Sequence, residues 1–173
     1  MDIRGPGVAE RSPLALAFVG DAVLSLMIRE RAMESGDNDA GRLTEAAARL
    51  ASARAQSVMY SVVAPSLSSE EAAVMRRGRN ANPRSRAKNA AVAEYRRATG
   101  LEALFGWLRL MGRDERAREL FIICVEAYEL GESQKAKNIQ GNKRAETGGA
   151  YRPPGKTAEI GGIGEAAKTG GGA

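Results

Sequence analysis

The sequence predicts an all-α protein. Aromatic residues make up only 5% of the chain, and few segments alternate apolar and polar residues as half-buried strands do. Alanine, leucine and arginine, which favour helices, fill long stretches between glycines, prolines and candidate helix caps. With 173 residues, the chain is long enough for one well-packed domain.

The first two helices are predicted from their ends. Ser12 has the character of an N-cap and Pro13 suits the first helical turn, so the first helix is expected to run to about Ser35, just before Gly36. A second, alanine-rich helix is expected over residues 40–63, because the proline that follows disfavours further helix.

Three more helices are expected in the second half of the chain. The stretch "SLSSEEAAVMRRGRN" predicts a short one, in which Ser68 and Glu71 have the spacing of a capping box and Gly78 marks the end. Longer helices are predicted over residues 89–111 and 114–130.

The composition predicts one ordered domain between two flexible ends. Eleven of the twenty glycines lie in residues 131–173, together with two prolines and few large apolar residues. Such a segment buries too little surface to order itself, so we expect it to be a disordered, glycine-rich tail. Residues 1–11 are expected to be a flexible N-terminus and residues 12–130 to form the domain.

Composition also excludes several kinds of chemistry. The chain has no histidine, which rules out serine-histidine and cysteine-histidine catalysis and histidine zinc sites. The single cysteine, Cys124, cannot form an intramolecular disulfide or a multi-thiolate zinc site. An enzyme with this sequence must use carboxylates, hydroxyls, amines or a metal held by oxygen.

The N-terminal stretch "MDIRGPGVAERS" has no apolar core and carries both signs of charge, so it does not resemble a signal peptide. The apolar run that follows is too short and too interrupted to span a bilayer. We therefore expect a cytoplasmic protein without a membrane partner.

Positive charge is concentrated in one segment, "RRGRNANPRSRAKNAAVAEYRR", residues 76–97. It holds eight positive residues and one negative residue, Glu94, a local net charge of +7, whereas the whole chain is +5 and the remainder is therefore −2. Clustered arginines suit phosphate groups, so a nucleic-acid contact is favoured over a solvated loop that only aids solubility. The cluster alone does not choose between RNA and DNA.

Two acids stand in apolar surroundings. Asp21 is the single charge in "PLALAFVGDAVLSLMI", and Glu102 lies in "TGLEALFGWLRLMG". Burying an unpaired carboxylate costs several kcal/mol, about 2–7 for a polar group and more for a charge. Structural explanations are a capping box of Thr99 with Glu102, and an ion pair of Asp21 with Arg54 or Arg97. Taken together, the two carboxylates could hold a hard divalent cation such as Mg²⁺.

These motifs resemble a known family. "LAFVGDAVLSLMIRERA" resembles the signature helix of the ribonuclease III family, and "GLEALFGWLRL" resembles its second acidic helix. "MRRGRNA" followed by "KNAAVAEYRRATG" is similar to the small bacterial branch called Mini-ribonuclease III. The resemblance covers about residues 12–130, with three separated motifs in the family's order.

The resemblance implies a helical endonuclease domain that forms a homodimer and cleaves double-stranded RNA with Mg²⁺, Mn²⁺ being an alternative. It implies maturation of large-subunit (23S) ribosomal RNA precursor, a ribosomal protein as a further partner, and no separate double-stranded-RNA-binding domain. Asp21 and Glu102 would be the catalytic and metal-binding residues. The RNA-binding residues would be Arg76, Arg77, Gly78, Arg79, Asn80, Lys88 and Asn89.

The chain also departs from the family's pattern. Full-length ribonuclease III enzymes carry further acids at positions that are occupied here by Leu14, Ala17 and Thr99. With two acids left, Thr99, water and RNA phosphate would have to complete the metal's ligands. Two alternatives to an enzyme stay open: a catalytically silent, ribosome-associated RNA-binding protein with this fold, and a basic DNA-binding helical domain.

Overall fold

The computed structural model describes residues 6–81 and 91–147, with the backbone alone at residues 6, 9, 91 and 140–147. Within these ranges the chain forms α-helices and two short 3-10 helices and contains no strand, which confirms the all-α prediction. The chain divides into two compact units, Met1–Lys137 and Asn138–Ala173. All sites discussed below lie in the first unit.

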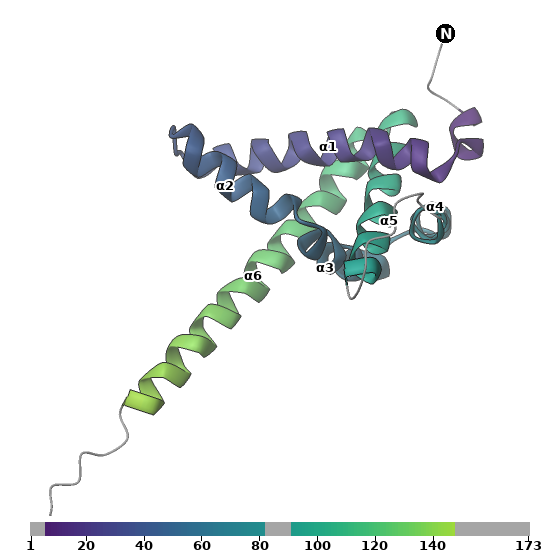
Figure 1. Ribbon diagram of the computed structural model, residues 1–173. Helices are drawn as coiled ribbons and strands as arrows, with labels where there is room; N and C mark the ends of the chain where they lie inside the picture. Colours follow the sequence, from purple (N-terminus) through teal and green to yellow (C-terminus); the bar gives the residue numbers. More distant parts are fainter. Residues whose placement is uncertain (1–5, 82–90, 148–173) are drawn as a thin grey trace, which may run out of the picture. The chain divides into compact units, whose positions relative to one another are not determined.

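The elements follow one another along the chain as Figure 1 shows. In order they are η1 (Pro6–Glu10), α1 (Pro13–Met33), α2 (Ala40–Ala51), α3 (Ala53–Val63), η2 (Ala64–Ser66), α4 (Ser69–Asn80), α5 (Ala91–Leu110) and α6 (Asp114–Thr147). None of the helices in the described ranges is both long and apolar enough to cross a membrane.

Local signals predicted several helix ends correctly. Pro13 opens α1, and Gly36, which follows its end, has a φ of 74° that favours glycine. The capping box before α4 is formed: the Ser68 hydroxyl accepts from the Glu71 amide at 3.2 Å, and the Glu71 carboxylate accepts from the Ser68 amide at 2.8 Å. Gly112, with a φ of 71°, follows α5.

The helix expected over residues 40–63 is in fact two helices. Ser52 is extended, with φ −64° and ψ 145°, and its hydroxyl accepts a hydrogen bond from the Ala55 amide at 3.2 Å. A serine can cap a helix in this way or lie inside one, so alanine-rich flanks alone did not reveal the break.

Two further helix ends were wrong. Gly78 does not end α4, which continues to Asn80. The last helix does not end near Leu130: α6 continues through Gly131 to Thr147. Glutamate, glutamine, lysine and alanine dominate this extension and favour helix, and the ion pair of Glu132 with Lys135 at 2.7 Å adds to them. The rest of the expected tail, residues 148–173, lies outside the described residues.

Helix α5 is the centre of the first unit. It packs against α1, α3 and α4, and its buried side chains include Leu101, Leu104, Phe105, Trp107 and Leu108. From α6, the core receives Leu120, Phe121, Cys124 and Val125. Full burial of each large apolar side chain contributes about 1.5–3 kcal/mol, so α5 is the element on which the others are positioned.

Helices α1 and α5 touch through glycines. A Cβ atom on Gly20 would lie 1.7 Å from the Glu102 carbonyl oxygen, and one on Gly106 would lie 2.0 Å from the Leu16 carbonyl oxygen. No side chain fits at either position. The backbones therefore meet directly, and Asp21, the residue after Gly20, is brought to the level of Glu102.

An ion pair fixes α4 to α6. The Arg116 guanidinium donates to both carboxylate oxygens of Glu71, at 2.9 and 3.0 Å, and also to the Ser66 carbonyl at 2.6 Å. Glu71 is buried, and the Arg116 hydrogen bonds lower its pKa. Because the guanidinium binds both carboxylate oxygens of Glu71, the pair holds the start of α4 in one position.

Candidate active site

The two predicted acids lie together at the crossing of α1 and α5. Asp21 is exposed and Glu102 is partly buried. Neither carboxylate has a hydrogen bond or an ion pair with any residue in the described ranges. In particular, no ion pair joins Asp21 to Arg54 or Arg97, so that structural explanation of Asp21 does not hold.

Electrostatics at the pair are unfavourable in the absence of a cation. Burial, and to a lesser extent the negative charge of Asp21, together raise the pKa of Glu102 to about 7. Two neighbouring carboxylates without a cationic partner are what a divalent cation would neutralise. The donor set therefore fits a hard cation that prefers oxygen ligands.

The protein supplies few ligands to such a cation. Among the described residues there is no group of three or more histidine, cysteine, aspartate or glutamate side chains that could hold a metal. Thr99 does not complete the set, because it is buried and its hydroxyl donates to the Tyr95 carbonyl at 3.0 Å. Thr99 also lies inside α5, so the predicted capping box with Glu102 is wrong.

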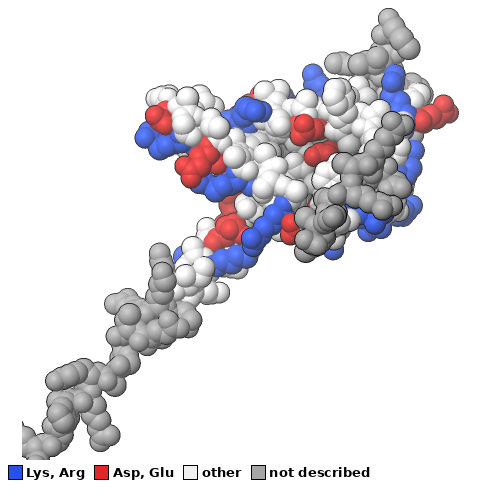
Figure 2. Space-filling model, in the orientation of Figure 1, with Lys and Arg blue, Asp and Glu red and all other residues white. Residues whose placement is uncertain are grey.

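The end of α4 presents the predicted basic residues. Arg76, Arg77 and Asn80 are exposed, and Arg79 is partly exposed and donates to the Asn80 side chain at 3.3 Å. Figure 2 shows basic side chains gathered on the α4 side of the molecule. Lys88 and Asn89 lie outside the described residues.

Gly78 has a different place from the one expected. It is buried, and a Cβ atom there would lie 2.6 Å from the Ala103 Cβ atom of α5. Gly78 is therefore a packing residue between α4 and α5. Its approach to RNA stays a prediction. As a packing residue, it lets the basic end of α4 sit close to α5.

The same contact places the basic residues beside the acid-bearing stretch of α5. A Cβ atom on Gly100 would lie 3.2 Å from the Arg79 Cβ atom and 2.8 Å from the Met75 carbonyl oxygen. Gly100 is two residues before Glu102 on α5. The basic end of α4 and the acid pair therefore lie beside neighbouring turns of α5.

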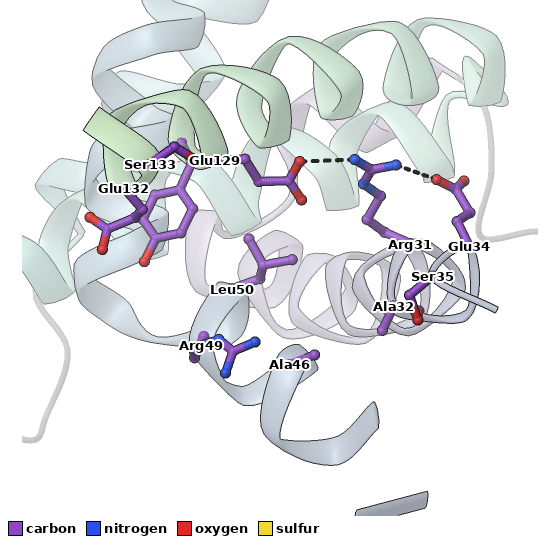
Figure 3. Close-up of a pocket in the computed structure, with 11 residues that line it drawn as sticks. Arg31, Ala32, Glu34, Ser35, Ala46, Arg49, Leu50, Glu129, Glu132 and Ser133 are labelled. Atoms are coloured by element: carbon purple, nitrogen blue, oxygen red, sulfur yellow. Dashed lines mark hydrogen bonds and ion pairs between the residues drawn. The ribbon is translucent and has the colours of Figure 1, made fainter. Parts of the chain in front are cut away.

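A pocket elsewhere on the first unit contains none of these residues. It has a volume of about 630 Å³ and lies between the end of α1, α2 and α6. In Figure 3, Arg31 lies between two carboxylates, with an ion pair to Glu129 at 2.8 Å and another to Glu34. Because Arg31 is already paired with carboxylates of the same pocket, we do not assign this pocket to the candidate active site.

Comparison with protein families identifies the fold. Residues 14–113 match the family described as the Ribonuclease III domain, an interval that includes both acids and all of α4. The chain belongs to the ribonuclease III family, in its Mini-ribonuclease 3 branch. Members of this family are endoribonucleases, and this chain is one of them.

Curated relatives support the branch. A Mini-ribonuclease 3 of Brevibacillus brevis is 44% identical over 123 residues, which cover 71% of this chain and 90% of that protein. One from Clostridium tetani is 34% identical over 130 residues, covering 75% and 86% of the two chains. A crystal structure of a Fusobacterium nucleatum protein has a TM-score of 0.61 at 28% identity and covers 71% of this chain and 98% of that one.

Proposed function

We propose that this ribonuclease III family endoribonuclease cleaves double-stranded RNA with a divalent cation, Mg²⁺ or alternatively Mn²⁺, held by Asp21 and Glu102. The observation that carries the proposal is the acid pair itself. Asp21 and Glu102 come from two helices that touch at Gly20, and the charge of Asp21 helps to raise the Glu102 pKa. Neither carboxylate has a cationic partner among the described residues. A protein that only bound RNA would gain nothing from two negative charges that repel phosphate.

Each residue would contribute in its own way. A bound cation supplies activation of water for attack on the phosphodiester and neutralises charge on the phosphate. Asp21, exposed at the surface, holds the cation where a duplex can reach it. Glu102, fixed in the central helix, sets the cation's position relative to the fold. No histidine is available as a general base.

The arginines at the end of α4 would bind the RNA backbone. Arg76, Arg77 and Arg79 lie on the last two turns of α4, beside the stretch of α5 that carries Glu102. Contacts of this kind read the shape and phosphates of an A-form duplex more than its sequence. By the family resemblance, we assign the physiological substrate to 23S ribosomal RNA precursor in the cytoplasm, with a ribosomal protein as helper.

The outer face of α1 supports a homodimer. Leu14, Phe18 and Leu26 follow one another at multiples of four residues, and Phe18 is 82% exposed. A large aromatic side chain left in water on an apolar helix face indicates a contact with another surface. A second copy of the chain would cover this face, with Phe18 one turn from Asp21.

One assay separates this proposal from its alternatives. The protein is incubated with duplex RNA, duplex DNA and single-stranded RNA, each with Mg²⁺ or with chelator. We expect cleavage of duplex RNA alone and only with Mg²⁺. Binding of duplex RNA without cleavage would instead identify the silent RNA-binding protein, and a preference for DNA would identify the DNA-binding domain.

A further inference from the structure

A notch between α3, α5 and α6 has no role in the function described so far. It has a volume of about 440 Å³. Three cationic side chains reach it from three helices: Arg54 from the first turn of α3, Arg97 from the second turn of α5, and Lys135 from α6. We propose that this notch is a second binding site for backbone phosphate of the RNA duplex, an inference that rests on the proposed function.

The charges around the notch leave it positive. Glu94 is the carboxylate in its lining. Glu132, just outside the lining, pairs with Lys135 at 2.7 Å, and the charge of Arg54 also helps to lower the Glu132 pKa. Three cations and two carboxylates give a net charge of +1 (3 − 2). Lys135 is partly neutralised by Glu132, whereas no ion pair is formed by Arg54 or Arg97 with the described residues.

Arg97 is held but not neutralised. Its guanidinium donates to the buried Ser57 hydroxyl at 3.5 Å, and no carboxylate in the described ranges pairs with it. A guanidinium has five N–H donors in a planar fork, so most of them stay available for a phosphate. The contact with Ser57 orients the side chain and lowers the entropy that phosphate binding would otherwise cost.

The position of the notch favours an RNA backbone over a small free anion. Gly100, one turn after Arg97, is the point at which α3 and α4 both approach α5: a Cβ atom there would lie 2.9 Å from the Tyr60 ring of α3 and 3.2 Å from the Arg79 Cβ atom of α4. The notch on the α3 side and the basic end of α4 therefore flank the same part of α5. A duplex carries phosphates at regular intervals, so it can contact both.

The test is a charge-removal variant, Arg54→Gln/Arg97→Gln/Lys135→Gln, in the full chain. Its matched control, Arg29→Gln/Arg49→Gln/Arg118→Gln, removes the same number of charges at exposed positions outside the notch. Binding of a labelled RNA duplex is measured by fluorescence anisotropy at several salt concentrations, with Ca²⁺ in place of Mg²⁺. We expect the notch variant to bind about tenfold more weakly, and its slope of log K against log salt to fall by about 1 to 2.

Two smaller changes keep the test independent of folding. Lys135→Gln changes one exposed residue of α6 and should lower the salt slope by less than the triple variant. A second comparison uses the single variants Arg97→Gln and Arg97→Lys. Arg97→Lys keeps the charge, so its slope of log K against log salt should be closer to the wild-type slope than that of Arg97→Gln.

The possible results are distinct. If the notch variant and the control have the same affinity and slope, while the wild-type protein cleaves duplex RNA, the notch proposal is overturned and the function stands. If the wild-type protein neither binds nor cleaves duplex RNA, the proposed function fails. Calorimetric titration with inorganic phosphate then reports on the notch: phosphate binding that the triple variant abolishes would overturn the RNA assignment in favour of a small-anion site.

Discussion

Glu102 bears the electrostatic cost of the acid pair. Its pKa is raised to about 7 by burial and by the neighbouring Asp21 charge, so at neutral pH the folded protein without a cation holds an unfavourable charge. Glu102 therefore lowers the stability of the fold and has no cationic partner among the described residues. Residues that lower stability in this way are typical of functional sites. Replacing that charge should therefore stabilise the protein while removing its activity.

The first prediction concerns Glu102→Gln in the presence of chelator. A carboxyl group whose folded-state pKa is raised destabilises the fold as pH rises from the unfolded value of about 4.5 to about 7. The variant should therefore be more stable than the wild type by up to about 3 kcal/mol at pH 8, and by much less at pH 5. Urea denaturation at the two pH values measures both differences.

Saturating Mg²⁺ provides the control. The cation should stabilise the wild type at pH 8 and leave Glu102→Gln nearly unchanged, because the variant has lost one of two charged ligands. Equal stability of the two proteins at pH 8 in chelator would show that the Glu102 charge does not destabilise the fold. That result would remove the argument for a cation at this position.

At the scale of elements, glycine contacts decide the geometry of the site. Gly20 and Gly106 let α1 and α5 meet backbone to backbone, and Gly78 and Gly100 do the same for α4 and α5. The first contact sets the acid pair and the second sets the basic end of α4. Helix α5 thus positions both the acid pair and the basic end of α4.

The second prediction compares Gly106→Ala with Gly131→Ala. A Cβ atom on Gly106 would lie 2.0 Å from a backbone oxygen of α1, so the helices must separate at a cost of about 3 kcal/mol or more. Gly131 lies inside α6 with nothing within 4 Å of an added Cβ, so alanine should stabilise by about 0.5–1 kcal/mol. Thermal denaturation of both variants measures the difference, and a Gly106→Ala protein as stable as the wild type would contradict the close contact.

Much of this arrangement could be predicted from sequence, and the reason differs between elements. Pro13, the Ser68–Glu71 capping box and the glycines after α1 and α5 act on their own neighbours, so a sequence pattern is enough to find them. At Ser52 and in residues 131–147, the local sequence is compatible with both a continued helix and a helix end, so the sequence pattern alone does not decide between them.

The site was predictable only in part for the same reason. Asp21 and Glu102 stood out as charges in apolar surroundings, and the structure places them at one helix crossing. Gly78 was assigned to RNA because its neighbours are basic, whereas its actual contact is with α5. Lys135 was not singled out, because residues 131–173 were expected to be a tail and not part of a helix. Contacts between distant segments have no local signature.

At the scale of the whole molecule, the exposed apolar face of α1 supports the proposal that the protein acts as a dimer. The third prediction is that Phe18→Asp breaks this dimer, because it places a charge in the apolar contact while Phe18 contributes little to the monomer's own core. Size-exclusion chromatography with light scattering should report twice 18.3 kDa for the wild type and 18.3 kDa for the variant.

The matched control for the dimer is Ile122→Asp. Ile122 lies on α6, is 53% exposed and is not part of the α1 face, so this variant should remain a dimer. A wild-type mass of 18.3 kDa would contradict the dimer, and loss of the dimer in Ile122→Asp alone would place the subunit contact elsewhere.

The measurement that tests the account most directly is cleavage of duplex RNA by Asp21→Asn with Mg²⁺. Asparagine keeps the size of the side chain and removes the charge of one proposed ligand, at a surface position where folding should not change. We predict that the cleavage rate falls by more than about 100-fold while binding of the same duplex is retained. Cleavage by Asp21→Asn at close to the wild-type rate would contradict the central claim that Asp21 and Glu102 hold the catalytic cation.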